Sequence, residues 1–354
     1  MTRDDGAVLI TGGAGFVGCN VAADHLSRGR RVRVLDDLSR PGVRDNLNWL
    51  CQAHGALVEP IVEDLVECER LDEVLKGVDA VYHFAAQVAV TTSLERPDLD
   101  FRTNLLGTFR LLEAIRRMQR PAKLVFASTN KVYGNLAHLR LEEAADRYTS
   151  VDLPAINEVQ PLDFHTPYGC SKGAAEQYVL DYARSFGIPA TVLRMSCIYG
   201  PHQCGTEDQG WVAHFLIRAL RGEPIHIYGD GKQVRDILYV DDLVAAERAA
   251  LQHMEVLRGR AWNIGGGLDC AVSLLEVLDL IGAIIGEPPD VRFRPPREGD
   301  QKYYVSDCSA FGEMTGWAPK VSPAEGVQRL SRWFREHLQL AAQSDRQESF
   351  AGAR

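Results

Sequence analysis

The sequence lacks the patterns that indicate a membrane protein or a nucleic-acid-binding protein. No apolar run approaches the roughly 18 residues of a membrane-spanning helix. The charged beginning, Met1 to Gly6, differs from a secretory signal peptide, which needs an apolar stretch. The formal net charge of −9 has the opposite sign to that of typical nucleic-acid-binding proteins. We therefore expect neither a membrane nor a nucleic acid as a partner.

Cysteine pairs of the kind that hold metals are also absent. The eight cysteines include no Cys-x-x-Cys spacing, so we expect no metal site and interpret them as reduced thiols of a cytoplasmic protein. No internal repeat or low-complexity tract occurs. With 354 residues, 45% of them hydrophobic and 25% charged, the composition is that of a globular protein, and the length suggests about two domains.

The first 40 residues have the pattern of a dinucleotide-binding loop. A short apolar strand at 7–10 is followed by Thr11-Gly12-Gly13-Ala14-Gly15-Phe16-Val17-Gly18 and a helical segment at 16–29. Glycines at this spacing allow a tight turn, the close approach of a pyrophosphate, and packing of the helix on the strand. Free N–H groups at the start of that helix bind phosphates.

Asp36 ends a second predicted strand, at 31–36, about 20 residues after the glycine loop. A carboxylate at this place binds the hydroxyl groups of the adenosine ribose and repels a 2′-phosphate. The pattern therefore favours NAD as the cofactor. Arg40 and Arg44 lie close by in the chain and leave NADP as an alternative.

Strands and helices continue to alternate through the first 195 residues. Further strands are expected at 57–63, 80–84, 123–127 and 191–194, and helices at 69–76, 98–119 and 167–186. Such alternation predicts an α/β fold with a doubly wound parallel sheet, which binds ligands at the C-terminal ends of its strands.

The regular alternation breaks after about residue 200. Helices are expected at 211–221, 241–253, 273–285 and 323–340, and strands at 225–228 and 261–264. We predict a Rossmann-like domain over 1–195, with strands returned to its sheet from about 234–265. A smaller mixed α/β domain is expected over 196–340, followed by a disordered tail over 341–354.

Tyr168 and Lys172 lie four residues apart, on one face of the helix predicted at 167–186. The spacing alone also fits an ordinary aromatic and cationic pair on an amphipathic helix. A phenol has a pKa of about 10, which must fall by about 3–4 units, or roughly 4–5 kcal/mol, for it to act as a base near neutral pH. Lys172 and an oxidised nicotinamide would supply the positive charges for this shift. Cys170, between the pair, is interpreted as a neutral helix residue.

Two further motifs are Ser128-Thr129-Asn130-Lys131-Val132-Tyr133-Gly134 and Gly231-Lys232-Gln233-Val234-Arg235-Asp236. Together with the glycine loop and the Tyr-Lys pair, they resemble the extended short-chain dehydrogenase/reductase family, in its nucleotide-sugar epimerase/dehydratase branch. The resemblance spans nearly the whole chain. It implies a modified Rossmann domain with a nucleotide-sugar-binding cap, tightly bound NAD that is regenerated in each turnover, and a homodimer or tetramer.

The resemblance also implies roles for individual residues. The expected catalytic residues are Thr129, Tyr168 and Lys172. The expected cofactor-binding residues are Gly12, Gly15, Phe16, Val17, Asp36, Asp37, Ser39, Asp64, Leu65, Ala85, Gln87, Asn104, Tyr168 and Lys172. The expected substrate-binding residues are Thr129, Asn130, His165, Gln209, Trp211, Arg235 and Arg297.

The two residues after the catalytic threonine reduce the number of reactions that the chain could catalyse. Dehydratases of this family carry Asp-Glu there as acid and base, whereas this chain has Asn130-Lys131, which leaves an epimerase, a decarboxylase or a simple reductase. The segments 45–50, 87–93, 163–165 and 208–212 resemble the CDP-tyvelose (CDP-paratose) 2-epimerases of the family. This resemblance implies inversion at C2 of a CDP-hexose, either paratose/tyvelose or glucose/mannose, by transient oxidation to a 2-keto sugar. A 4-epimerase of UDP- or dTDP-sugars and a non-catalytic NAD-binding regulator stay open as alternatives.

Overall fold

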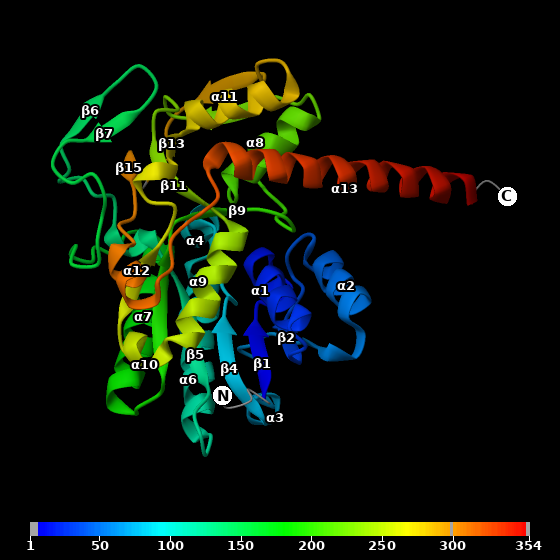
Figure 1. Cartoon of the computed structure of the whole chain (residues 1–354), viewed down its shortest axis with the longest axis vertical. Coiled ribbons are helices and arrows are strands. Elements are labelled where there is room, and N and C mark those ends of the chain that lie inside the picture. The colour runs from blue at the N-terminus through cyan, green and yellow to red at the C-terminus, as the bar shows by residue number, and fades with distance from the viewer. Residues whose placement is uncertain (1–5, 298–299, 352–354) are drawn as a thin grey trace.

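A seven-stranded parallel sheet forms the centre of the larger part of the molecule (Figure 1). The computed structural model describes residues 6–297 and 300–351. The strands follow the order β12-β8-β5-β4-β1-β2-β3, and β1 lies between β2 and β4. The direction of winding reverses at β1 and β4, which is where sheets of this kind bind ligands. The strands are β1 Ala7–Thr11, β2 Val32–Asp36, β3 Val58–Val62, β4 Val78–His83, β5 Lys123–Thr129, β8 Ala190–Met195 and β12 Ala261–Ile264.

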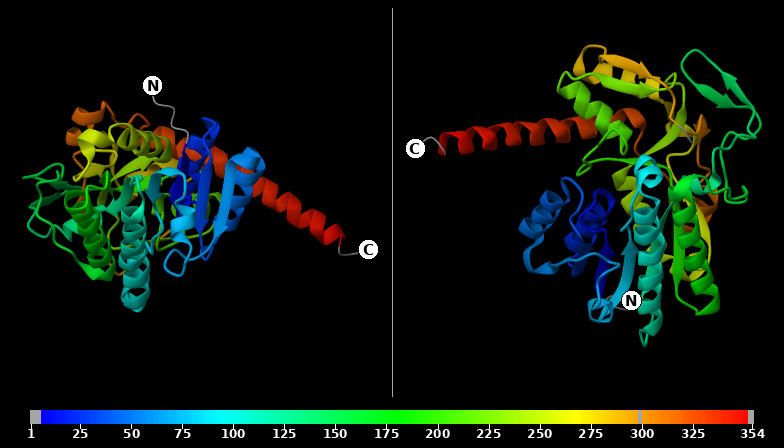
Figure 2. Two further views of the ribbon diagram at one scale, coloured as in Figure 1. Left: turned by 90° about the horizontal axis from the view of Figure 1, so that it is seen from below. Right: turned by 180° about the vertical axis from the view of Figure 1, so that it is seen from behind.

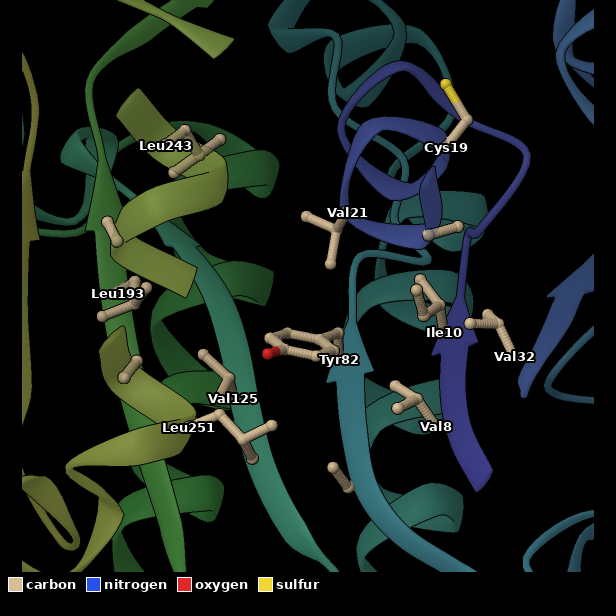
Figure 3. Packing of buried hydrophobic residues seen from close by; sticks show 14 of the residues in the cluster. Val8, Ile10, Cys19, Val21, Val32, Tyr82, Val125, Leu193, Leu243 and Leu251 are labelled. Atoms are coloured by element: carbon tan, nitrogen blue, oxygen red, sulfur yellow. The ribbon is translucent and has the colours of Figure 1, made fainter. Parts of the chain in front are cut away.

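Helices cover both faces of this sheet because side chains alternate along each buried strand. Val8 and Ile10 of β1 face one side, where Tyr82, Val125 and Leu193 from the neighbouring strands join them (Figure 3). That side is covered by α1 Phe16–Ser27, α2 Val43–His54, α9 Val240–Gln252 and α10 Met254–Leu257. The opposite side is covered by α3 Leu71–Val74, α6 Gly107–Arg117 and α7 Thr166–Ser185. The predicted doubly wound α/β fold is confirmed.

A smaller part of mixed α/β structure lies over the C-terminal edge of the sheet (Figure 1). Its four-stranded sheet contains β9 Cys197–Tyr199, β11 Val234–Tyr239, β13 Ala271–Ser273 and β15 Tyr303–Tyr304. Two further pairs are β10 Ile225–Tyr228 with β14 Val291–Arg294, and β6 Leu141–Glu143 with β7 Tyr148–Ser150. Its helices are α8 Trp211–Leu220, α11 Leu274–Ile285 and α13 Pro323–Ala351, whereas α12 Ser309–Thr315 packs against β12 of the large sheet. Of the returning segment 234–265, β12 joins the seven-stranded sheet, whereas β11 belongs to this smaller one. The domain boundary at residue 195 stays a prediction.

The helix predicted at 98–119 is interrupted. It consists of α5 Pro97–Asp100, a π-helical turn at Phe101–Leu106, and α6. The short helix α4 Val90–Glu95 precedes it, and 3-10 turns occur at Gly55–Leu57, Asn130–Tyr133 and Leu268–Cys270. Since π-turns inside helices often occur at functional sites, the interruption directs attention to the residues that it holds.

The last helix differs from its prediction. It was expected to end at 340 with a disordered tail beyond, but α13 runs to Ala351 and extends away from the rest of the molecule (Figure 2). No glycine or proline occurs between 327 and 351, so the sequence contains no residue that would end the helix earlier. Residues 352–354 lie outside the described residues. No helix in the described ranges is long and apolar enough to cross a membrane.

Candidate active site

The loop between β1 and α1 has a backbone shape that only glycine allows. Gly12 has a φ of +67°, and a Cβ there would lie 2.6 Å from the backbone nitrogen of Ala85. A Cβ on Gly18 would lie 2.2 Å from the carbonyl oxygen of Gly12. The loop therefore turns tightly into the open N-terminus of α1, whose N–H groups favour an anion. These features fit the pyrophosphate of a dinucleotide.

Asp36, at the end of β2, holds this loop from the side. Its carboxylate accepts hydrogen bonds from the backbone N–H groups of Ala14 at 3.1 Å and Leu38 at 2.9 Å. Burial raises the pKa of Asp36, and the two hydrogen bonds oppose the rise. Asp37 and Ser39 lie in the exposed turn after it, where the Ser39 backbone N–H and hydroxyl donate to Asp37 at 3.0 and 2.7 Å.

Two neighbouring cavities open where the large sheet meets the smaller part of the molecule. The first has a volume of about 350 Å³ and includes the glycine loop and the ends of β5 and α7. The second has a volume of about 390 Å³ and is walled by α8, β10 and β11. Both are lined by Val90, Asn130, Lys131, Cys197, Asp208, Gln209, Gly210 and Trp211. The two cavities are therefore adjacent and share these residues as a common border.

Thr129, Tyr168 and Lys172 all line the first cavity. Each is buried, with relative exposures of 7%, 8% and 4%. Thr129 ends β5, while Tyr168 and Lys172 lie one turn apart near the start of α7. Burial raises the pKa of Tyr168 to about 12, and a side-chain hydrogen bond with Thr129 opposes the rise. The structure thus brings together the three residues that the sequence singled out.

Lys172 is held by the strand beneath it. Its Nζ donates to the carbonyl oxygen of Ala127 at 2.6 Å and lies 4.2 Å from the centre of the Phe126 ring. Burial lowers the pKa of Lys172 to about 7, while the carboxylates of Glu176 and Asp100 favour its charged form. Since burial raises the pKa of Tyr168, the fall predicted for that phenol depends on a further positive charge beside it, such as that of an oxidised nicotinamide.

A buried ion pair lies beneath the residues of β5 and α7 that line the first cavity. Glu176 of α7 and Arg194 of β8 form a charge pair in which both side chains are almost fully enclosed. The Ser128 hydroxyl donates to Glu176 at 2.7 Å, and Arg194 donates to the Tyr133 hydroxyl at 2.8 Å. This network joins β5, β8 and α7 and so fixes the backbone on either side of Thr129.

The loop after β4 is fixed by the π-helical turn. Asn104, buried within that turn, accepts from the backbone N–H of Gln87 at 2.8 Å and donates to its carbonyl oxygen at 3.0 Å. Asn104 also donates to the Ser171 hydroxyl at 3.0 Å. Asn104 and Gln87, both predicted to bind the cofactor, thus hold the β4 loop against the π-helical turn and α7. Their contact with a cofactor stays a prediction. Ala85, in the same loop, donates to Thr11 at 3.4 Å.

Three other predicted residues, Asp64, Leu65 and His165, line neither of the two cavities. Asp64 pairs with Arg102 at 3.1 Å, and its neighbour Leu65 is buried in the core. His165 is exposed, pairs with Asp163 at 3.0 Å, and lines neither cavity. The predicted residues that line the first cavity are Gly12, Gly15, Phe16, Val17, Thr129, Asn130, Tyr168, Lys172, Gln209 and Trp211.

The second cavity has several cationic side chains. Arg235 of β11 is buried and donates to Asp300 at 2.8 Å. Arg297 lies over the Tyr228 ring, with its guanidinium carbon 3.9 Å from the ring centre. Lys131 lines both cavities, although the sequence interpretation used it only to argue against dehydration. Its position beside Arg235 arises from the tertiary fold, so the local motif contained no signal for it.

Arg40 is a second residue that the sequence analysis underestimated. It lines the first cavity, and its guanidinium donates to the side chain of Gln209, which lies 169 positions later in the chain. Arg40 therefore links the cofactor side of the cavity to the segment before α8. The sequence indicated it only as a residue that leaves NADP as an alternative.

The comparisons with known proteins agree with this geometry. Residues 8–265 match the NAD dependent epimerase/dehydratase family. CDP-paratose 2-epimerase from Salmonella typhi is 43% identical, with 92% of this chain and 98% of that protein covered. A putative UDP-glucose 4-epimerase from Methanocaldococcus jannaschii is 32% identical, with 93% and 99% covered.

The fold is also similar to that of a solved epimerase structure. The structure of UDP-glucose 4-epimerase from Thermus thermophilus in complex with NAD superposes with a TM-score of 0.79, at 35% identity, and covers 93% of this chain and 99% of its own. The glycine loop, the buried Thr129–Tyr168–Lys172 group and these matches lead to one assignment. The chain belongs to the NAD-dependent epimerase/dehydratase family and is an NAD-dependent enzyme of the isomerase class.

Proposed function

We propose that this enzyme inverts C2 of a CDP-linked hexose, either CDP-paratose/CDP-tyvelose or CDP-glucose/CDP-mannose. The observation that carries the proposal is the 43% identity to a CDP-paratose 2-epimerase along nearly the full length of both chains. The identity to the putative UDP-glucose 4-epimerase, 32%, is clearly lower. The presence of Asn130 and Lys131 beside the catalytic threonine, in place of an acidic pair, also argues against dehydration.

The proposed chemistry assigns a role to each buried residue of the first cavity. NAD, when bound, supplies a reversible acceptor for the hydrogen on C2. Tyr168 takes the proton of the 2-hydroxyl, and Thr129 hydrogen-bonds the same oxygen. Lys172 stabilises the phenolate of Tyr168 by its positive charge. After the sugar has turned its other face, Tyr168 returns the proton to the oxygen, so the enzyme ends each cycle in its starting state.

Several residues are proposed to hold the cofactor. The glycine loop, with Gly12, Gly15, Phe16 and Val17, receives the pyrophosphate. Asp36 receives the adenosine ribose, while Asp64 and Leu65 border the adenine. Lys172, on α7, would hold the nicotinamide half of the cofactor. The tight turn at Gly12 and the two backbone hydrogen bonds to Asp36 support this arrangement, since both fix the loop before the ligand arrives.

The second cavity is proposed to hold the nucleotide. Arg235 and Arg297 bind the diphosphate, because a planar guanidinium matches phosphate oxygens in a bidentate way. Gln209 and Trp211, at the junction of the cavities, border the sugar. Holding the nucleotide in one cavity while the sugar turns in the other explains how one set of catalytic residues serves both faces.

We also propose that the protein is a cytoplasmic homodimer or tetramer. Apolar side chains are exposed along the helices of one face, among them Phe101 at 57%, Phe109 at 38% and Tyr178 at 44%. Phe109 of α6 and Tyr178 of α7 contact each other, with ring centres 5.9 Å apart. These two helices lie side by side on the surface (Figure 2). Burying this apolar face against a second copy would remove it from water.

The function is tested by incubating the purified protein, without added NAD, with CDP-paratose and separately with CDP-glucose. NMR coupling constants of the sugar protons then report the configuration at each carbon. Inversion at C2 is the expected result. UDP- and dTDP-sugars are incubated in parallel, and inversion at C4 of one of these, with the CDP-sugars left unchanged, would favour the 4-epimerase alternative.

A further inference from the structure

Lys131 occupies an unusual place between the two cavities. It lies in the 3-10 turn Asn130–Tyr133, immediately after Thr129. The backbone N–H of Lys131 donates to the Thr129 hydroxyl at 3.2 Å, which fixes the start of this turn. Its side chain lines both cavities. Lys131 therefore lies at the border between the cavity of the catalytic threonine and the cavity of Arg235.

The ammonium of Lys131 has donors to spare. An ammonium group offers three hydrogen-bond donors. Within residues 6–297 and 300–351, one acceptor is found for it, the Gln301 side-chain oxygen at a long 3.3 Å. That glutamine donates in turn to the carbonyl oxygen of Gly134 at 2.5 Å, so its own position is fixed. The remaining donors of Lys131 are available to a ligand.

Lys131 lies close to a second cation, because its ammonium donates to the side chain of Gln301 and Arg235 donates to the backbone oxygen of the same residue. Burial lowers the pKa of Lys131, the positive charge of Arg235 adds to this effect, and the carboxylate of Asp300 opposes it. Asp300 is already paired with Arg235 at 2.8 Å. Two cations thus share one carboxylate, which is itself 37% exposed. An anionic ligand between the two cavities would supply the second negative charge beside Lys131 and Arg235.

We propose that Lys131 binds the diphosphate of the substrate together with Arg235, at the junction of the two cavities. This inference rests on the proposed function in one respect, that the substrate is a nucleoside diphosphate sugar. Lys131 then has a positioning role, because it holds the phosphate next to the sugar in place while the sugar presents its second face. At the position where dehydratases of the family carry a carboxylate as base, the lysine thus supplies an anchor for the substrate.

The test measures binding, not turnover. Calorimetric titration of the purified enzyme with its bound NAD compares CDP with cytidine, and likewise UDP with uridine and dTDP with thymidine. The variants are Lys131→Met, which removes the charge and keeps the length, and Lys131→Arg, which keeps the charge. Lys76→Met is the matched control, since Lys76 is exposed and lines neither cavity. Thermal melting of each variant verifies that it is folded.

Lys131→Met is expected to weaken binding of the diphosphate about tenfold or more, because charge-assisted hydrogen bonds to phosphate are lost. Binding of the nucleoside should change less than about twofold, and Lys131→Arg should retain most of the affinity. Equal weakening of diphosphate and nucleoside, or no weakening of either, would overturn the inference, as would a wild-type enzyme that binds none of the three diphosphates. The preference for one base tests the proposed function separately, because the comparison of diphosphate with nucleoside holds for any base.

Discussion

Glu247 provides a direct test of the buried core between α1, β4 and α9. Its carboxylate is fully buried, and neither oxygen has a hydrogen-bond partner within the described residues. The neighbouring Tyr82 hydroxyl donates to the backbone oxygen of Glu247 at 3.3 Å and lies 3.1 Å from His25 Nε2. Burial raises the pKa of Glu247 from 4.5 to about 8. The folded protein therefore keeps this side chain protonated at neutral pH.

The consequence for stability has a definite sign. Between pH 4.5 and about 8 the folded state holds a proton that the unfolded state has lost, so Glu247 makes the protein less stable as the pH rises through this range. At about 1.4 kcal/mol per unit, protonating Glu247 at pH 7 costs about 3 kcal/mol, and the cost grows by about 2.5 kcal/mol between pH 5 and pH 7. Glu247→Gln removes this cost while it keeps the shape of the side chain.

The assay is urea unfolding of the wild type and of Glu247→Gln at pH 5, 6, 7 and 8. The stability of the variant relative to the wild type is expected to increase by about 2.5 kcal/mol from pH 5 to pH 7 and to level off above pH 8. The pKa of His25, which burial lowers to about 4, affects both proteins equally and cancels in the difference. Glu255→Gln, whose side chain is 81% exposed, is the control and should run parallel to the wild type. Parallel curves for Glu247→Gln would refute the burial of this carboxylate.

Three further predictions concern the site and the assembly. Tyr168→Phe should lower turnover by about 10²–10⁴-fold and leave the NAD content of the purified protein unchanged, and a variant with full turnover would contradict the role of this phenol as base. Gly12→Ala should purify with little NAD, as measured by absorbance of the denatured protein's supernatant, because the new methyl group would lie 2.6 Å from the backbone nitrogen of Ala85; normal NAD content would argue against the loop as the pyrophosphate site. The double change Phe109→Glu and Tyr178→Glu should convert the assembly to monomers in light scattering, and unchanged mass would exclude this face as the interface.

The local elements of the chain could be predicted where one short segment determines them. The strand, glycine loop and helix of β1 and α1 are determined by residues that are adjacent in sequence. The strands β10 and β12 were predicted with the bounds that the structure has. The resemblance of their motifs to those of the family also indicated Thr129, Tyr168 and Lys172, which the structure places in one cavity. Their catalytic roles stay a prediction.

Elements that depend on distant partners could not be predicted in this way. β11 is fully buried although it contains Arg235 and Asp236. Their charges are accommodated by residues far along the chain, Asp300 for the arginine and the Ser196 and Ser306 hydroxyls for the aspartate. A local pattern with two charged residues does not indicate a buried strand.

The electrostatic surroundings of the site residues also depend on distant parts of the chain. The position of Lys131 beside Arg235 and Asp300 requires that segments about 100 and 170 residues away meet at one place. The pKa of Tyr168 depends on how deeply the phenol is buried, which spacing along a helix does not reveal. The sequence therefore predicts which residues form the site, whereas the protonation states of these residues depend on the three-dimensional structure.

The central claim is that inversion occurs at C2 by removal and return of the same hydrogen. The most direct test is ¹H NMR of CDP-paratose incubated in D₂O with the purified protein and no added NAD. The account predicts inversion at C2 with the C2 proton fully retained, since that hydrogen never exchanges with the solvent. Uptake of deuterium at C2, or inversion at a different carbon, would contradict it.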